Sequence, residues 1–442
     1  MEKLDRGQTI RVGSAFLAIM AFWQMYNNIV PLMLTNTFHM DETYSGTIMA
    51  MDNVLALFLL PFFGGLSDRC QSRLGRRRPF ILFGTIASVI LMLFVPILDN
   101  RYASEPFGRT RLLFVVVLGL LLVAMGTYRS PAVALMPDVT PKPFRSAGNA
   151  IINLMGAIGA ILYLIIAAVL YSAKRTEGLA HVNYFPIFAI VGLIMILSLL
   201  VLLFTVDEVM LSERVREYEE AHPEEVLTET GEGGKEELPR PVRRSLIFLL
   251  LSVALWYIAY NSVETWFTTY ANRVWGMSLG SASLCLTIGM AGAIVTYIPA
   301  GMAAERIGRR RTILGGVLLL FLCFLGMFFL TLRLTAFHPI LYIVFILVGI
   351  AWASINVNSL PMVVEMCASS DIGKFTGYYY AFSMAAQIIT PIAAGLCMHH
   401  LGYRSLFPYA AIASFLAIVT MRMVRHGDAR LVRRSKENSD SA

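Results

Sequence analysis

The chain carries little charge for its length. Of its 442 residues only 15% are Asp, Glu, Lys or Arg, whereas 57% are hydrophobic. A soluble domain has about 25% charged residues, so this composition excludes an ordinary soluble enzyme and indicates an integral membrane protein. The net charge of +7 does not indicate nucleic-acid binding, because most Lys and Arg residues fall in segments predicted to lie on one side of a membrane.

Cysteine and histidine are also sparse. The five Cys are scattered and lack the spacing of a disulfide framework or a metal site. The seven His fall in predicted loops or helix ends, which disfavours an intramembrane enzyme or a lipid scramblase. The N-terminus lacks a signal peptide, so we expect the first helix to direct insertion. We expect no enzymatic activity, no metal and no organic cofactor.

Long apolar runs, in contrast, are abundant, and each can cross a hydrocarbon core of about 30 Å. We predict twelve membrane helices, at residues 11–35, 43–66, 80–98, 112–138, 147–172, 184–206, 244–270, 279–304, 312–332, 339–366, 374–398 and 405–424. The outer connections between them are short, and one is expected at 99–111. The predicted fold class is therefore an all-α integral membrane protein with an even number of spans, which places both termini on one side.

A basic loop at residues 64–80 fixes the predicted orientation. Its sequence is GGLSDRCQSRLGRRRPF, in which Asp68 is the one acid beside five Arg. Short loops rich in Lys and Arg are retained in the cytoplasm. This loop, the basic N-terminus and the basic stretch at 425–436 predict that both termini are cytoplasmic, in a multi-pass protein of the cell (inner) membrane.

The basic loop has a second copy at residues 300–311, AGMAAERIGRRR. An internal duplication of this kind is typical of transporters. We predict two pseudo-symmetric six-helix halves, at 1–206 and 245–442, joined by a cytoplasmic linker at 207–244. The linker is rich in charge, and we interpret it as a solvated hinge without chemistry.

The charged residues of the two loops are interpreted as structural latches. Asp138 and Glu365, at matching helix ends, are expected to pair with loop arginines in the outward-open state; solvated helix-end acids are the alternative. The predicted gating set comprises Asp68, Arg69, Arg73, Gly75, Arg76, Arg77, Asp138, Glu305, Arg306, Gly308, Arg309, Arg310 and Glu365.

The duplicated pattern, an acid-Arg pair followed by Gly-Arg-Arg, resembles the signature loop of the major facilitator superfamily. The longer string from Pro61 to Ile81 resembles the sucrose-proton symporters of plants and their animal and bacterial relatives. That group is similar to the glycoside-pentoside-hexuronide:cation symporters. The resemblance implies the major facilitator fold and movement of a sugar together with a cation.

Two ionisable residues fall near mid-depth in the apolar segments. Asp52 and Arg129 are each about nine residues from a segment end, and buried charges usually mark a pathway or a partner. We expect them to pair and Asp52 to be the proton site, because Arg does not release its proton. A structural pair holding two helices is the alternative. The resemblance implies an Arg at Val133, so Arg129 stands one turn earlier.

A third ionisable residue, Glu264, aligns with an Asp that the resembling group carries, and we include it in the proton-coupling set. Trp256, Tyr260 and Glu264 step by four and share a helix face, with Asn261 beside them. Aromatic rings near a carboxylate suit a sugar, which offers apolar ring faces and hydroxyls. The alternative is a set of aromatics that anchors a helix end at the interface.

Neutral polar residues form stripes on two further segments and complete the predicted substrate site. Lipid would disfavour such stripes, so they are expected to face protein or water. The residues are Trp23, Gln24, Asn27 and Asn28 on the first segment, and Trp352, Asn356 and Asn358 on the tenth. Amides and indoles indicate a neutral polyhydroxylated substrate, although polar residues that only bridge helices are the alternative.

The leading hypothesis is proton-driven uptake of a neutral sugar, a disaccharide or glucoside such as sucrose or maltose, by alternating access. Sodium coupling would favour two or more carboxylates in the second and fourth segments, and the second has only Asp52. A sugar sensor that does not transport remains a further alternative. The expected partners are the sugar, H+ as the coupling ion and membrane lipid, with no nucleic acid, and the expected state is a monomer.

Overall fold

A computed structural model describes residues 5–141, 144–221, 239–334, 336–366 and 372–427. Within these residues, twelve helices are long and apolar enough to cross a membrane. They are α1 (Arg6–Leu32, extended by the π-helix Met33–Thr37), α2 (Glu42–Asp68), α3 (Arg78–Ser104), α4 (Gly108–Asp138), α5 (Arg145–Leu170), α7 (Phe185–Thr205), α10 (Arg240–Trp275), α11 (Leu279–Ile307), α12 (Arg309–Arg333), α13 (Ile340–Val364), α14 (Ile372–Leu401) and α15 (Leu406–Arg422). Each overlaps one predicted span.

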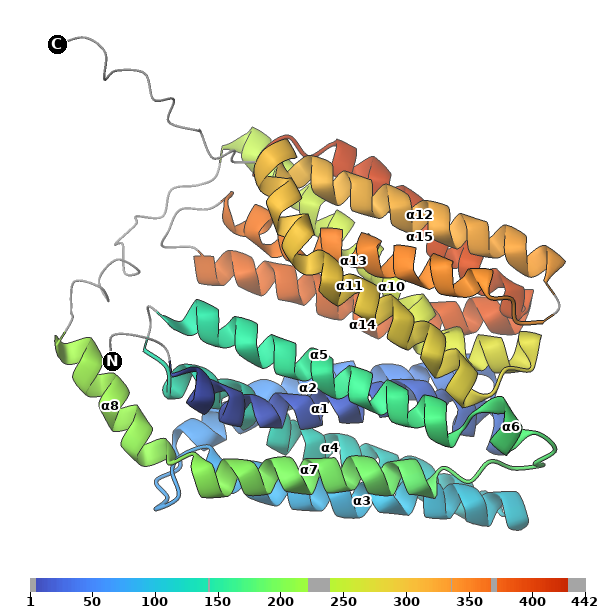
Figure 1. The fold of residues 1–442 in the computed structure, drawn as a ribbon, viewed down its shortest axis with the longest axis horizontal. Helices are drawn as coiled ribbons and strands as arrows, with labels where there is room; N and C mark the ends of the chain where they lie inside the picture. The colour runs from blue at the N-terminus through green and yellow to red at the C-terminus, as the bar shows by residue number, and fades with distance from the viewer. Residues whose placement is uncertain (1–4, 142–143, 222–238, 335, 367–371, 428–442) are drawn as a thin grey trace, which may run out of the picture.

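The helices form two groups that lie side by side (Figure 1). In the first, α1 packs on α5 and α3 packs on α4; in the second, α13 packs on both α11 and α12. Buried apolar side chains form two clusters, which follow these two groups apart from Leu279. We call the groups the N-terminal and C-terminal halves. Each half therefore has an apolar core of its own.

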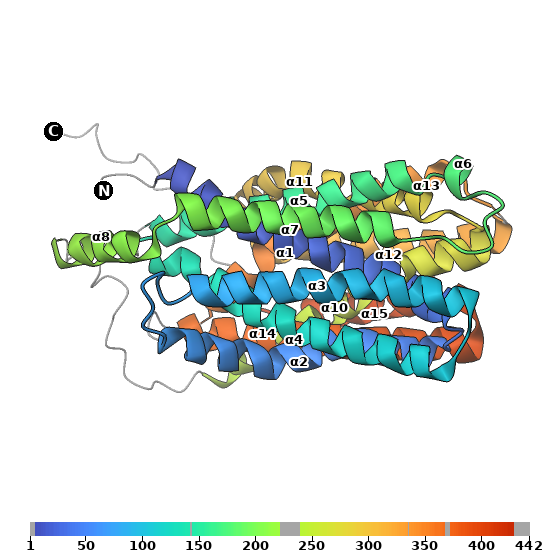
Figure 2. The ribbon, with the colours of Figure 1, turned by 90° about the horizontal axis from the view of Figure 1, so that it is seen from below.

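The two ends of the bundle differ. At one end α1 begins and the short helix α8 (Glu208–Ala221) projects beyond the membrane helices (Figure 2). We call this the linker end and the opposite one the far end. The far end carries the turn between α1 and α2 and the four-residue helix α6 (Ala173–Thr176).

Backbones of the two halves approach closely at the far end. A Cβ atom added to Gly46 of α2 would lie 2.2 Å from the carbonyl oxygen of Pro391 in α14. A Cβ on Gly280 of α11 would lie 2.4 Å from the carbonyl oxygen of Tyr171, to which the Gly280 N–H donates a hydrogen bond of 2.8 Å. Only glycine permits these contacts, since any larger residue would push the halves apart.

Hydrogen bonds add to this contact. Asn36 donates from Nδ2 to Oδ1 of Asn272 at 3.0 Å, and Arg273 donates from Nη2 to the Thr35 carbonyl at 2.8 Å. Thr268 donates to the Asn28 carbonyl at 3.1 Å. The structure is therefore closed between the halves at the far end.

Candidate functional site

A cavity lies between the two halves. It encloses about 420 Å³, including space open to solvent. Gln24 of α1 lines it from the N-terminal half, and Tyr260, Val263 and Glu264 of α10 line it from the C-terminal half.

An aromatic stack stands beside this cavity. The rings of Tyr260 and Trp352 are parallel, with centroids 3.9 Å apart and an interplanar angle of 10°. Tyr257 meets Trp352 edge-on at 5.2 Å. Two predicted substrate residues from different helices, Tyr260 and Trp352, are thus brought together. Tyr257 was not predicted, because it lies outside the four-residue spacing that links Tyr260 to Glu264.

Trp256 does not line the cavity, contrary to the prediction. It is fully buried in the core of the C-terminal half, and its indole N–H has no hydrogen-bond partner among the residues that the structure describes. A four-residue step on a helix turns the face by about 40°, so two such steps separate Trp256 from Glu264 by roughly 80°. Tyr260 and Glu264 therefore reach the cavity, and Trp256 turns into the core.

Glu264 lacks a charged partner within the described part of the chain. It is half-buried, and no cation of a described residue interacts with its carboxylate. The neighbours that the structure assigns to it are the hydroxyls of Tyr260 and Tyr297. Tyr297 of α11 also interacts with Asn356, so the predicted amide stripe of α13 reaches the same region. Sequence reasoning missed Tyr297, which has no charge and no polar neighbour at helical spacing.

Asp52 and Arg129 do not form the predicted ion pair. They interact electrostatically, but their nitrogen and oxygen atoms are more than 4.0 Å apart. The Arg129 guanidinium instead lies over the ring of Trp23, 5.5 Å from its centroid. A planar guanidinium stacks well on an indole, and this contact competes with the carboxylate.

Asp52 has other polar neighbours. Its Oδ1 accepts hydrogen bonds from the backbone N–H and the side-chain amide of Asn53, at 2.6 and 2.8 Å. The hydroxyl of Tyr26 is fully buried, has no hydrogen-bond partner in the described part of the chain, and interacts electrostatically with Asp52. Tyr26 also meets Trp23 edge-on at 5.6 Å. The N-terminal half therefore presents a polar cluster of Trp23, Tyr26, Asp52 and Arg129.

The predicted amides divide into two kinds. Asn28 and Asn358 are buried and donate to the carbonyl four residues earlier, at 2.6 and 2.9 Å, so their NH2 groups satisfy their own helices. Asn27 and Asn356 are half-buried. Asn261 keeps a buried NH2 group without a partner. Among these amides, the fully buried atoms without a hydrogen-bond partner in the described structure are the Oδ1 of Asn28 and the Nδ2 of Asn261.

The basic loop of the N-terminal half is held by Arg77. This side chain is 6% exposed, forms an ion pair with Asp68, and donates from Nε to Asp138 at 2.8 Å. Arg76 adds a weaker contact to Asp138 at 3.7 Å. Burial opposes the charge of Arg77, but the hydrogen bond and attraction from Asp138, with further attraction from Asp68, raise its pKa overall.

The second loop has a parallel arrangement. Arg309 forms an ion pair with Glu365, and Arg310 donates to the Arg422 carbonyl at 2.8 Å. Both carboxylates thus pair with loop arginines of their own half. The two pairs are present in a structure whose far end is closed, and each lies within one half, so neither pair depends on contact between the halves.

Within the described ranges, the other predicted loop arginines form no ion pair. Arg69, Arg73 and Arg306 are solvent-exposed, and Gly308 is buried with a φ of 97°. The side chain of Glu305 lies outside the described residues.

The start of the linker carries chemistry that the sequence did not reveal. Glu208 is 2% exposed, and its carboxylate accepts hydrogen bonds of 2.7–3.0 Å from the backbone N–H groups of Arg76, Arg77 and Arg78 at the start of α3. Gly75 has a φ of 107°, and a Cβ there would lie 2.3 Å from the Glu208 carboxylate. Glu208 is therefore a buried helix cap, which differs from the solvated linker expected at this position.

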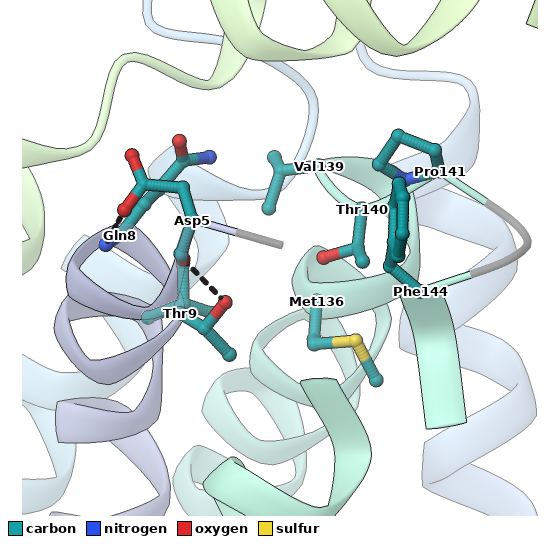
Figure 3. A pocket seen from close by; sticks show the side chains of 9 residues that line it. Asp5, Gln8, Thr9, Met136, Val139, Thr140, Pro141 and Phe144 are labelled. Atoms are coloured by element: carbon teal, nitrogen blue, oxygen red, sulfur yellow. Dashed lines mark hydrogen bonds between the residues drawn. The ribbon is translucent and has the colours of Figure 1, made fainter. Parts of the chain in front are cut away.

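A second pocket of about 330 Å³ opens at the linker end (Figure 3). Asp5, Gln8 and Thr9 line one side of it, and Met136 and Phe144 lie on the other. Asp5 accepts from the Gln8 N–H at 3.0 Å, and the Thr9 hydroxyl donates to the Asp5 carbonyl at 2.8 Å. These polar groups serve to cap α1, so the candidate site is the cavity between the halves.

Comparisons with known proteins support a transporter architecture. The family model described as Major Facilitator Superfamily matches residues 12–284 and 272–441. The chain is also similar to a solved bacterial homologue of the iron transporter ferroportin, with a TM-score of 0.68, 13% identity, and coverage of 95% of this chain and 99% of that one. At that identity the likeness shows the fold alone.

Similarity to curated proteins is local. The sucrose transport protein SUC3 of Arabidopsis thaliana is 32% identical over 138 residues, which span 28% of this chain and 23% of that protein. The putative glycoside/cation symporter YagG of Escherichia coli K12 is 26% identical over 211 residues, spanning 47% and 44%. The chain thus matches about a quarter to a half of the length of these relatives.

Proposed function

The chain belongs to the Major Facilitator Superfamily, and we propose that within it this protein takes up a neutral sugar, a disaccharide or another glucoside, together with a proton. The relatives named for sucrose and glycoside transport support the substrate class. Alternating access of two halves around a central site is the mechanism that such duplicated transporters use.

The observation that carries this proposal is the cavity shared by both halves. Gln24 on one side and Tyr260 and Glu264 on the other offer hydrogen-bonding groups to one ligand. The Tyr260–Trp352 stack offers a flat apolar wall beside them. A sugar ring has apolar faces and hydroxyl edges, so it suits a wall of this kind with amides and a carboxyl around it.

Asp52 is the proposed proton site. It can be neutral or charged, while Arg129 remains a cation that favours the charged form. Because no ion pair locks them together, the carboxylate is free to exchange its proton as the substrate binds. Arg129 keeps a second stabilising contact, with Trp23, when Asp52 is neutral.

We assign the linker end to the cytoplasm in this proposal, because short loops rich in Lys and Arg are retained there. The structure, which is closed at the far end, would then be closed to the outside. Binding of sugar and proton from outside would precede this arrangement, and release to the cytoplasm would follow it.

Counterflow of labelled sugar in proteoliposomes tests the proposal, with substrates chosen from a panel that raises the melting temperature of the purified protein. We expect counterflow of a disaccharide or glucoside, and accumulation when only a pH gradient is imposed. If a sodium gradient alone drives accumulation, the coupling ion is Na+ and not the proton. Sugar binding without any counterflow would indicate a sensor and would contradict transport.

A further inference from the structure

Asp99 is a buried carboxylate near the far end of α3, where the sequence predicted a loop. Its side chain is 0% exposed, and among the described residues no donor meets hydrogen-bond geometry to either carboxylate oxygen, although the Thr37 hydroxyl lies close by. A charged carboxylate without hydrogen bonds is costly to bury, so this position needs a proton or a nearby cation.

His181, in the connection before α7, can supply Asp99 with a proton or with a positive charge. Its Nε2 lies 3.4 Å from Oδ2 of Asp99 and 2.9 Å from Oδ1 of Asn100, and its side chain is 27% exposed. The imidazole therefore connects the buried carboxylate with solvent at the far end. The two groups can share one proton, either as a carboxylic acid beside a neutral imidazole or as an ion pair.

The other groups around Asp99 do not titrate near neutral pH. The Tyr184 hydroxyl interacts with Asp99, and burial raises the pKa of Tyr184 and that of its neighbour Tyr171. Thr37 contributes a neutral hydroxyl. In the part of the chain that the structure describes, His181 is the one basic side chain at ion-pair distance from Asp99. Burial lowers the pKa of His181, so the imidazole passes a proton on readily.

The same carboxylate borders the contact between the halves. Thr37, beside Asp99, is the last residue of the π-helix Met33–Thr37. The two residues before it make the contacts with α10, in which Thr35 accepts from Arg273 and Asn36 donates to Asn272. Single π turns of this kind are frequent at functional positions. Thr37, the neighbour of Asp99, is therefore one residue from Asn36 and two from Thr35, which make the contacts that close the far end. A change of charge at Asp99 acts next to these contacts.

We propose that Asp99 and His181 form a second proton-binding site, separate from Asp52, and that loss of its proton opens the far end. With one proton shared, the buried carboxylate is neutral or paired, and the π-helix packs against it. Without that proton Asp99 is an unpaired buried anion, which is relieved when the far end opens to water. This role rests on the alternating access of the proposed function, in which external protons would favour closure after loading.

Distances between spin labels test this site without any sugar or gradient. Labels on cysteines at Phe107 and Leu401, both exposed at the far end of opposite halves, would be placed in a variant lacking the native cysteines. We expect the longer-distance population to grow as the pH rises from about 6 to about 9. In Asp99→Asn this pH dependence is lost and the short distance persists. Glu105→Gln, an exposed acid at the same helix end, should behave as wild type.

His181→Gln provides a second variant should Asp99→Asn not fold. Loss of the ion-pair form should lower the midpoint of opening by about one pH unit or more. Wild-type pH dependence in Asp99→Asn, or an unchanged midpoint in His181→Gln, would overturn the proposal. Absent counterflow with normal pH-dependent opening would instead count against sugar transport alone, so the two failures are distinguishable.

Discussion

At the scale of single residues, Asp52 has one neighbour that hydrogen-bonds to it and two that interact with it only electrostatically. Asn53 donates hydrogen bonds to it, while the buried Tyr26 hydroxyl and the Arg129 guanidinium interact with it electrostatically without a hydrogen bond or ion pair. A proton-coupled site needs a carboxylate that is stable in both states. Because the Arg129 guanidinium stacks on Trp23, protonation of Asp52 breaks no ion pair in this conformation.

Replacing Asp52 with Asn should therefore separate exchange from accumulation. The amide mimics the protonated carboxyl, so counterflow of sugar should continue while accumulation driven by a pH gradient is lost. Arg129→Lys keeps the cation but loses the planar fork, and we expect weaker coupling with binding retained. Proteoliposome uptake with and without a pH gradient measures both. If Asp52→Asn accumulates sugar as well as wild type, Asp52 is not the proton site, and Glu264 is the next residue to test.

Gly75 is a residue whose identity follows from its backbone. Its φ of 107° and the Glu208 carboxylate beside it leave no room for a Cβ. We expect Gly75→Ala to destabilise the protein by roughly 1–3 kcal/mol and lower its melting temperature in detergent. Gly65→Ala is the matched control, since no atom lies within 4 Å of a Cβ there. Equal melting temperatures for both variants would contradict this account.

At the scale of elements, the start of α3 is stabilised by the linker helix α8. The carboxylate of Glu208 satisfies three N–H groups that a helix start leaves unpaired, and its charge suits the positive end of the helix. Leu211 and Val215 of α8 are buried, which keeps Glu208 in place. The loop that follows α2 is thus held from both sides, by Arg77 and by Glu208.

Glu208→Gln should lower stability by roughly 1–3 kcal/mol, because the amide accepts fewer hydrogen bonds and lacks the charge. Glu213→Gln removes an exposed acid from the same helix and should have little effect. Melting temperatures of the two purified variants provide the comparison. If both match wild type, the cap contributes no measurable stability.

The helices themselves were predictable, whereas several contacts between them were not. Apolar length predicted all twelve spans, with ends that differ from the helix ends by up to six residues, since a hydrocarbon core sets a minimum length. The end of α3 was misplaced: Asp99, Asn100 and Arg101 are typical of a loop, but the helix continues to Ser104 because packing at the far end buries Asp99. Charge alone signals a loop, and the burial that overrides it depends on residues distant in sequence.

In the candidate site, too, features of a single helix were predictable, whereas contacts between helices were not. Helical spacing identified Tyr260, Glu264 and Gln24 as facing an interior, which depends on one helix at a time. The partner of Arg129 could not be identified in this way, because matching depth does not decide between Asp52 and Trp23. Glu208 gave no signal, since an acid in a charged linker becomes a cap only where the fold brings it to a helix start.

At the scale of the whole molecule, the two halves are joined by close backbone contact at the far end. Gly46 and Gly280 belong to different halves, yet each packs on a carbonyl of the opposite half. The polar contacts of Asn36 and Arg273 lie at the same end. Contacts this close form only when the halves are brought fully together, so a small change in side-chain volume there should alter the balance between conformations.

Gly280→Val should hinder closure of the far end. The added side chain would collide with the Tyr171 carbonyl, 2.4 Å from the Cβ position. Overpacking of this kind costs about 1–3 kcal/mol, which would shift the equilibrium roughly 5- to 150-fold towards the open far end. We expect counterflow to fall accordingly, while a sugar that binds still raises the melting temperature, because the cavity residues are unchanged. Gly315→Val, a helical position with no atom within 4 Å, is the control and should transport as wild type. Normal counterflow in Gly280→Val would show that transport does not require the close contact between α11 and Tyr171.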